Sequence, residues 1–423
     1  QVQPEPAERC DTPQDDDCDG TAQCEPVLSW SEPFPATAFH VAIDPQGYVV
    51  VAGTGFGDFQ DQTLGDLFVM QLRPDGQLRW IRNFSTGAGQ LSVGGMAVDE
   101  QGWITMVGFH QGSPDFGGGP LEPAGFSGAY LVRFDREGVH RFSRSEDHTS
   151  FAALALGSEG STYALGRDEE LTDEGFFEES LIITAFDAEG QPRWSKTGQG
   201  VAGLYEDAMS IAATAQGEVV VSVVMGEGGL VDAELDGMPL ELPGYAPTML
   251  RLDAEGTLRQ QRLPYDDPTG GIADLELSVR PDGILELVAN HYGGGTFDGV
   301  MLTRFDAELE PLLQLELGDG TWAHAQASGL DGTSVLGIEF FGQLELGPIG
   351  VGVPSFGPGL ALAAVDEAGD GRWLELLYSM SFAEMHGLAV GPSGEVVVAA
   401  RVDGGATLAG QQVGDRFLAM LRP

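Results

Sequence analysis

Cysteine is nearly absent from this chain of 423 residues, and the positions of the few cysteines limit the roles that they can have. Cys10, Cys18 and Cys24 all lie in the first 24 residues, and the rest of the chain has none. Cysteines clustered in a polar segment are typical of a local disulfide outside the cell, in this case with a third thiol left over. The sequence does not show which two would pair. The body of the protein has no cysteine for a Cys–His catalytic pair.

Positive charge is also scarce. Lysine and arginine together number 20 against 65 acidic residues, which gives a formal net charge of −45, and Lys196 is the single lysine. A field of this sign repels phosphate backbones, so nucleic acid is an unfavourable partner. Cations, basic proteins and neutral sugars remain as candidate partners. The simplest interpretation of the charge, however, is a well-solvated surface that resists aggregation.

Long apolar runs and helical periodicity are missing as well. No apolar run approaches the roughly 18–20 residues of a membrane-spanning helix. No basic, apolar signal segment is present, so we expect Gln1 to be a processed N-terminus. The β-branched runs, together with 62 glycines and 24 prolines, instead predict an all-β protein.

Residues 38–84 contain the pattern around which the chain is organised. Four short strand-like runs are separated by the turns DPQG (44–47) and PDG (74–76) and by a glycine-rich loop. Glycine takes the positive φ that such turns require, so turn dipeptides between β-branched and aromatic runs predict hairpins. The first-turn glycine recurs seven times, as Gly47, Gly102, Gly160, Gly217, Gly283, Gly332 and Gly394. The second turn recurs less regularly, and Leu309 stands where unit five should have glycine.

The seventh unit lacks a fourth strand, because FLAMLRP (417–423) aligns with FVMQLRP (68–74) and the chain then ends. A lone strand, VLSWSEPF (27–34), is available near the N-terminus to complete it. This split unit predicts a seven-bladed β-propeller of four-stranded antiparallel blades, closed by the N-terminal strand. The predicted organisation is an acidic tail, 1–26, followed by a propeller, 27–423. A β-solenoid is the alternative, but its units are shorter and would not explain the split.

The innermost strands supply candidate functional residues. The row four positions before each first turn is small in most units, but His40 and Glu276 are large and polar there. His324 and His386 occupy equivalent places in neighbouring units, five residues before Gly329 and Gly391. With His40 they are predicted to meet near the mouth of the axis as a metal or substrate cluster, or to be hydrogen-bonded structural histidines.

The tail contains half of a calcium-binding pattern. Asp15, Asp17 and Asp19 alternate before Gly20, as carboxylates do when several oxygens must point at one Ca²⁺ ion. The closing bidentate glutamate is out of place, since Glu25 comes one position early. A Ca²⁺ site and an acidic solvated linker are both compatible with this segment.

Other chemical motifs are missing from the sequence. It shows no serine nucleophile elbow, no phosphate-binding glycine loop and no H-E-x-x-H pattern, so no catalytic or cofactor-binding residue is predicted. Trp30, Trp80, Trp194 and Trp373 recur at one repeat position and are therefore predicted to be packing residues. Trp103 and Trp322 lie elsewhere in the repeat.

Residues 109–135, FHQGSPDFGGGPLEPAGFSGAYLVRFD, resemble the bacterial SBBP-type β-propeller repeat. A looser match is GGGTFDGVMLTRFDAE (293–308), and the resemblance extends over about 27–423. It implies a secreted or surface-attached bacterial protein and transfers no catalytic residues. The segment CDTPQDDDCDG (10–20) is similar to Asp-rich, Cys-flanked segments of secreted myxobacterial proteins, in which such stretches are suspected metal binders.

These observations predict a secreted or cell-surface propeller whose work is non-catalytic. Binding, adhesion or structural assembly would use the face of the long loops, with a protein or glycan as partner, and the tail would serve attachment, self-assembly or cation binding. The alternative is a hydrolase or lyase acting on a polysaccharide at the same face, since paired carboxylates support such chemistry on other propellers.

Overall fold

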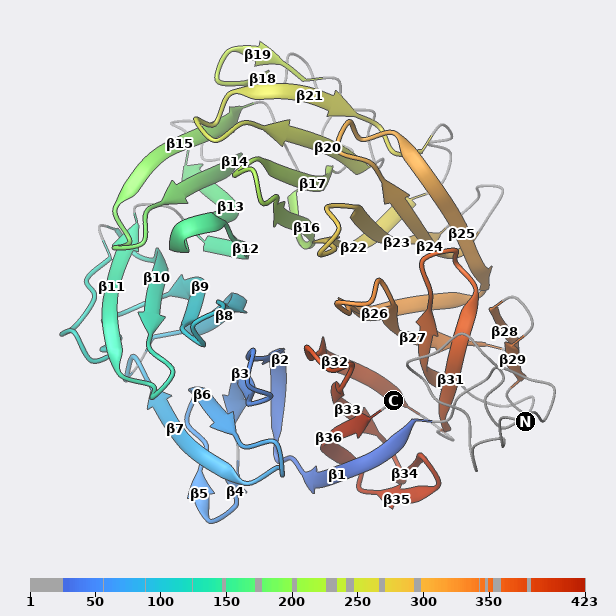
Figure 1. The fold of residues 1–423 in the computed structure, drawn as a ribbon. Helices are drawn as coiled ribbons and strands as arrows, with labels where there is room; N and C mark the ends of the chain where they lie inside the picture. The colour runs from blue at the N-terminus through green and yellow to red at the C-terminus, as the bar shows by residue number, and fades with distance from the viewer. Residues whose placement is uncertain are drawn as a thin grey trace.

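Each predicted repeat forms a sheet of four antiparallel strands, and seven such sheets surround one axis (Figure 1). The computed structural model describes residues 26–55, 57–87, 89–123, 125–146, 150–171, 177–199, 204–225, 234–240, 247–265, 271–292, 298–341, 343–346, 349–352, 359–378 and 382–422. The fold class predicted from the sequence is confirmed, and the solenoid alternative is wrong.

Each blade contributes one strand to each of four concentric rings. In the order of blades 1 to 7, the inner strands are β2 (Ala36–Ile43), β8 (Leu91–Val98), β12 (Ser150–Leu156), β16 (Leu204–Ala213), β22 (Gly271–Val279), β26 (Thr321–Ser328) and β32 (Ala383–Val390). In the same order, the second strands are β3 (Val49–Gly55), β9 (Ile104–His110), β13 (Thr162–Leu171), β17 (Val219–Met225), β23 (Leu285–Tyr292), β27 (Ser334–Phe340) and β33 (Val396–Val402). The third strands are β6 (Leu67–Leu72), β10 (Gly128–Phe134), β14 (Phe177–Phe186), β20 (Pro247–Leu252), β24 (Gly299–Phe305), β30 (Gly359–Val365) and β36 (Arg416–Arg422). The outer strands are β7 (Leu78–Phe84), β11 (His140–Glu146), β15 (Pro192–Gln199), β21 (Leu258–Arg262), β25 (Pro311–Asp319), β31 (Gly371–Tyr378) and β1 (Val27–Pro33).

The tight turns form for the reason that the sequence suggests. All seven first-turn glycines adopt a positive φ, between 78° and 87°. In blade 1 the Asp44 carboxylate supports the turn, because Oδ1 accepts the backbone N–H groups of Gln46 and Tyr48, each at 2.9 Å. In blade 5 Leu309 takes the left-handed conformation in place of glycine, with φ +58°, and its side chain is fully buried. That burial offsets the strain of a branched side chain at positive φ.

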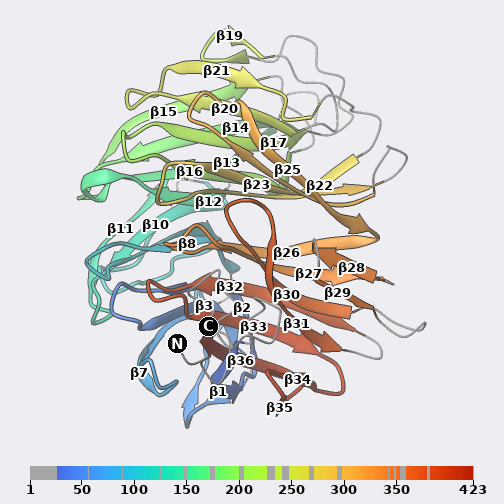
Figure 2. The ribbon, with the colours of Figure 1, turned by 45° about the vertical axis from the view of Figure 1, so that its right-hand side comes forward.

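The N-terminal strand closes the ring. β1 pairs antiparallel with β36, with Trp30 opposite Met420, and the two strands lie side by side in both views (Figures 1 and 2). The indole N–H of Trp30 donates to the carbonyl oxygen of Pro74 in blade 1 at 3.1 Å. Buried Phe34 packs edge-on against Phe59 and Phe68 of blade 1, with ring centroids 5.5 and 6.0 Å away. The seam therefore has its own apolar core.

Similar contacts join other neighbouring blades through their outer strands. Trp80 and Trp194 donate their indole N–H groups to carbonyl oxygens in the second turn of the next blade, at 3.1 Å to Arg136 and 2.9 Å to Ala254. Trp373 is buried in the core that blades 6 and 7 share. The prediction that these tryptophans are packing residues is confirmed.

Some of the loops between second and third strands contain hairpins that contact the preceding blade. In blade 4, β18 (Glu234–Leu235) and β19 (Met238–Pro239) form a hairpin that extends the sheet of blade 3 through β15. The other hairpins are β4 (Asp58–Phe59) with β5 (Gln62–Thr63), β28 (Gln343–Leu346) with β29 (Ile349–Gly352), and β34 (Ala406–Leu408) with β35 (Gln411–Val413). Each of these hairpins contacts the blade before it. The ring of Phe59 packs against Phe34, and Leu344 belongs to the same apolar cluster as Leu317. The backbone N–H of Ala409 donates a hydrogen bond to the carboxylate of Glu375.

The short turns between strands lie on one face of the ring and the long loops on the other, as the antiparallel order requires. Among the described residues, the remaining regular element is a 3₁₀ turn, η1 (Ser158–Gly160). Within the described ranges, no helix has the length and apolar character needed to cross a membrane.

Candidate functional site

A cavity of about 800 Å³ occupies the axis of the ring, and residues of all seven inner strands line it. Its walls include His40, Glu276, His324 and His386, so the structure places all four predicted axis residues on one surface. Inner strands begin at the long-loop face, and His324 and His386 are the fourth residues of β26 and β32. The polar lining is therefore reached from the face of the long loops.

A repeated β-bulge determines which side chains face this cavity. The pairing of the inner and second strands shifts by one residue in blades 1, 2, 3, 5, 6 and 7. In blades 2, 3, 5, 6 and 7 the bulged residues are Gly94, Ala152, Asp274, His324 and His386. A bulge leaves one residue without a ladder partner and turns its side chain in a new direction. Blades 5 to 7 carry polar residues there, so Asp274, His324 and His386 share one side of the cavity.

The bulged polar residues have carboxylate or amide neighbours. The Nε2 atom of His324 lies 3.1 Å from Glu339 Oε2, and His386 Nδ1 lies 3.7 Å from Glu384 Oε1. Asn290 Nδ2 donates to the carboxylate of Asp274 at 3.2 Å. Burial lowers the pKa of His386 from its ordinary value, although the Glu384 carboxylate acts against that shift.

His40 and Glu276 lie on the same cavity lining, and their pKa values are shifted in opposite directions. Enclosure by the ring lowers the pKa of His40 to about 4, against a hydrogen bond to the backbone of Val93 that favours the charged form. The same enclosure raises the pKa of Glu276 to about 8, with a smaller upward contribution from Glu286 and an opposing hydrogen bond from the Gln326 backbone. The accessible surface of the two side chains reduces this effect, because Glu276 is exposed to the cavity and His40 is only half-buried.

These shifts give Glu276 a testable effect on stability. Between pH 4.5 and about 8 the folded protein holds a proton on Glu276 that the unfolded chain has released, so stability falls as pH rises through this window. Glu276→Gln removes that loss. We expect the variant's advantage in free energy of unfolding to grow across the window to about 1–2 kcal/mol, after allowance for solvent screening. Denaturant unfolding at several pH values measures it.

His40 provides the control of opposite sign. Its pKa is lowered from 6.5 to about 4, so the unfolded chain takes up a proton as pH falls through this range while the folded protein does not. His40→Asn should therefore stabilise the protein increasingly toward acid pH and have little effect near neutrality. If both variants change the free energy of unfolding by the same amount at every pH, enclosure by the ring does not shift the pKa values of these two groups.

Four aromatic side chains lie on the long-loop face of blades 5 to 7. The aromatic rim consists of Tyr292, Trp322, Phe341 and Phe382, which lie at strand ends on the long-loop face. Tyr292, Phe341 and Phe382 are 42%, 60% and 40% exposed, and the rings of Tyr292 and Trp322 are 6.5 Å apart. Trp322 precedes His324 by two residues on β26, which places it within about 7 Å along the strand.

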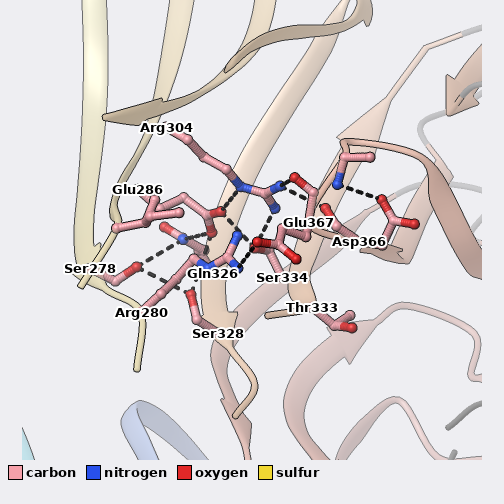
Figure 3. A network of polar contacts seen from close by, with 12 residues as sticks. Ser278, Arg280, Glu286, Arg304, Gln326, Ser328, Thr333, Ser334, Asp366 and Glu367 are labelled. Atoms are coloured by element: carbon pink, nitrogen blue, oxygen red, sulfur yellow. Dashed lines mark hydrogen bonds and ion pairs between the residues drawn. The ribbon is translucent and has the colours of Figure 1, made fainter. Parts of the chain in front are cut away.

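Behind the cavity wall, a buried polar network joins blades 5 and 6 (Figure 3). Gln326 lines the cavity, and its Nε2 donates to the carboxylate of Glu286 and to Ser278 Oγ. Glu286 also accepts from Arg304 Nε at 2.7 Å and from Ser334 Oγ at 2.6 Å. The other six inner strands have an apolar residue at the position of Gln326, such as Leu277 and Leu388, and the network accounts for the exception.

The sequence also suggested a histidine metal site at the axis and functional residues in the tail. Within the described ranges no three His, Cys, Asp or Glu side chains converge as metal ligands, which leaves the three axis histidines without a metal-binding arrangement. The predicted tail residues lie outside the described residues: Cys10, Cys18 and Cys24 as disulfide candidates, and Asp15, Asp17, Asp19 and Glu25 as calcium ligands.

Sequence reasoning did not identify Asp274 or the aromatic rim as parts of the site. Trp322 carried a signal, because it lies outside the repeat position at which the packing tryptophans recur. Asp274 carried none, since its place on the lining depends on the bulge in β22.

No protein-family model and no curated protein matches this sequence. Solved structures with a similar fold include the Dos1 propeller, at 10% identity over 94% of this chain and 95% of that one, with a TM-score of 0.46. An ulvan lyase of a new family of polysaccharide lyases is 10% identical over 93% and 94%, with a TM-score of 0.49. A protein of unknown function from Dyadobacter fermentans is 14% identical over 95% and 98%, with a TM-score of 0.43. No residue role is transferred from any of them, and the propeller assignment rests on this chain's own sheets.

Proposed function

We propose that this protein is a non-catalytic binding propeller that receives a glycan in the axial cavity from the long-loop face. The observation that carries the proposal is that the same three blades, 5 to 7, present the aromatic rim on the long-loop face and polar side chains on the cavity lining. Exposed aromatic rings offer a flat apolar surface to the C–H face of a sugar, while carboxylates and imidazoles bind its hydroxyl groups. A cavity of about 800 Å³ has room for several sugar rings.

Trp322→Ala tests the proposal. A glycan array first identifies a ligand, and titration calorimetry then compares wild type with the variant. We expect at least a tenfold loss of affinity, equivalent to about 1.4 kcal/mol, because the substitution removes the ring stacked against the sugar.

Trp103→Ala is the matched control. Trp103 follows the first turn of blade 2 on the short-turn face, where the guanidinium groups of Arg133 and Arg141 lie over its ring. Its loss should leave glycan affinity within about twofold. An equal loss in both variants would mean that the effect is on folding, and an array with no bound glycan would contradict the proposal.

A second function is favoured by one observation, the raised pKa of Glu276. A carboxyl group that keeps its proton near neutral pH can act as a general acid in the cleavage of a polysaccharide by a hydrolase or lyase. Asp274 and Glu384 line the same cavity and would supply the second carboxylate. A screen of polysaccharides for new reducing ends or unsaturated products distinguishes the two functions: turnover that Glu276→Gln abolishes would replace the binding proposal.

Secretion or surface display and the role of the tail belong to this proposal too. Its support is the sequence: the resemblance to secreted bacterial repeats, and the Cys/Asp pattern of residues 10–20. Titration of Ca²⁺ into the full chain, with Asp15→Asn and Asp17→Asn as variants, tests the tail. No response at millimolar Ca²⁺ would remove the calcium part of the proposal.

A further inference from the structure

We propose that residues 23–25 of the tail, which lie outside the described part of the chain, dock on their own ring and replace a turn that blade 7 lacks. The docking site is a pocket of about 360 Å³ between blades 6 and 7. The first turns of these two blades line it, together with Arg372 and Trp373 of β31, so it lies on the short-turn face. This inference does not depend on glycan binding.

At other junctions of the ring, the second turn of one blade covers a tryptophan on the outer strand of the blade before it. The indole N–H donates to a backbone carbonyl oxygen of that turn. The pairs are Trp30 with Pro74, Trp80 with Arg136, and Trp194 with Ala254. The turn glycine also lies against the ring, since a Cβ added to Gly76 would come within 2.8 Å of Trp30. Each of these turns therefore supplies both an acceptor and a cover.

The second turn also packs on the first turn of its own blade. In blade 1, a Cβ added to Gly47 would lie 3.6 Å from Pro74. The second turn thus fills a space that is bounded by its own first turn and by the tryptophan of the preceding blade. For blade 7 the corresponding residues are Gly394 and Trp373, and both line the pocket. The pocket is therefore the space that a second turn of blade 7 would fill.

Blade 7 has no such turn because its third and outer strands, β36 and β1, come from opposite ends of the chain. Trp373 is only 6% exposed, and no described residue accepts a hydrogen bond from its indole N–H. A buried donor without an acceptor costs free energy, so this pocket favours an occupant with a backbone carbonyl oxygen.

The ladder between β1 and β36 determines which tail residues reach the pocket. Leu28 corresponds to Leu78 of blade 1, because each pairs with the leucine at the same place on the third strand. Four residues before each of them, Cys24 corresponds to Pro74, whose carbonyl oxygen is the acceptor in blade 1. The carbonyl oxygen of Cys24 is thus placed to accept the indole N–H of Trp373.

The start of β1 lies beside the pocket. Leu28 and Trp373 belong to the same apolar cluster. Pro26 is buried, so the chain lies against the ring where its described part begins. The pocket lining includes three valines, which suit the small apolar side chain of Cys24.

Cross-linking of the full chain tests the docking, because the ring has no cysteine of its own. Cys10→Ser and Cys18→Ser leave Cys24 as the single thiol of the tail, and Ser393→Cys adds a thiol on the pocket lining. A short bismaleimide is added at low protein concentration, and peptide mass spectrometry measures the link between positions 24 and 393. We expect this link in most chains, because docking gives the two thiols a high effective concentration.

Gln101→Cys, made in place of Ser393→Cys, is the matched control. Gln101 has the same position in the first turn of blade 2, and both residues are exposed. We expect a yield at least tenfold lower than at position 393. Equal yields would mean that the tail has no fixed place on the ring, and a link that joins two chains would assign the pocket to a neighbouring copy. Either result overturns the inference.

Trp373→Phe in the cross-linking variant tests the hydrogen bond, because phenylalanine keeps an aromatic ring and removes the N–H donor. We expect the yield of the link between positions 24 and 393 to fall several-fold. Trp80→Phe is the control, since the N–H of Trp80 donates to a carbonyl oxygen in blade 2, and it should leave the yield unchanged. No fall in Trp373→Phe, or an equal fall in both variants, overturns the replacement of the turn.

Hydrogen exchange gives a second measurement that needs no cysteine variant. Chains with and without residues 1–25 are compared, and β1 is complete in both. We expect the first turns of blades 6 and 7, residues 329–334 and 391–396, to exchange at least tenfold faster without the tail. The first turn of blade 2, residues 99–104, should be unchanged. Unchanged exchange in all three turns, or an equal increase in all three, contradicts docking in this pocket and leaves glycan binding intact.

Discussion

Replacing Arg304 with alanine should lower the free energy of unfolding by about 3–5 kcal/mol, because it leaves the charge of Glu286 buried without its partner. The Arg304 side chain is 2% exposed and that of Glu286 is fully buried. Arg304 Nη1 also donates to the carbonyl oxygens of Asp366 and Glu367 at 2.6 Å, and Nη2 donates to Ser334 at 3.0 Å. One side chain thus joins blade 5 to two segments of blade 6 (Figure 3).

Arg251 provides a matched control for this prediction. It occupies the same repeat position in blade 4 and pairs with Glu218, but the two side chains are 18% and 26% exposed. Water can therefore solvate what remains after Arg251→Ala, and we expect a loss of no more than about 1 kcal/mol. Denaturant unfolding followed by tryptophan fluorescence compares the two variants.

A double substitution separates the cost of an unpaired charge from the loss of packing. Arg304→Met with Glu286→Leu removes both charges and keeps most of the volume, so it should be clearly more stable than Arg304→Ala alone. A double variant as unstable as the single one would show that the hydrogen bonds to Asp366, Glu367 and Ser334 carry the stability, and not the ion pair.

Deleting residues 26–34 should prevent the protein from folding as a stable monomer. The deletion removes the outer strand of blade 7, exposes the edge of β36, and takes away buried Leu28 and Phe34 together with the Trp30–Pro74 hydrogen bond. Burial of a large apolar side chain contributes about 1.5–3 kcal/mol, so the loss of Leu28 and Phe34 alone costs about 3–6 kcal/mol. An unpaired strand edge also promotes association. Size-exclusion chromatography and far-UV circular dichroism measure both effects.

A circular permutant shows whether the strand or its covalent position matters. Val27 lies opposite Arg422 in the β1–β36 ladder, so a short Asp-Gly turn can join the two residues while the chain opens before Ala36. Every strand of the ring is retained, and we expect a folded monomer with a Tm within a few degrees of the parent. A permutant as unstable as the deletion would mean that the ring is not closed by this ladder.

The sequence alone determined the repeat, the number of blades and the way the ring closes. These features follow from local chemistry: glycine at a left-handed turn position such as Gly47, alternation of buried and exposed residues along each strand, and an unpaired strand around Trp30. Even the exception at Leu309 was visible, because the turn lacks its glycine. The tail stays a prediction, since residues 1–25 lie outside the described part of the chain.

Only the tertiary structure decided which of these side chains share a site. The bulge that turns His324 and His386 toward the axis has no residue signature, since glycine and alanine occupy it in blades 2 and 3. Its cause is the pairing of two strands, which a single strand's sequence does not encode. The exposure of Trp322 and the role of Gln326 were undetermined for a related reason: each depends on which blade lies next to it, and that contact exists only once the ring has closed.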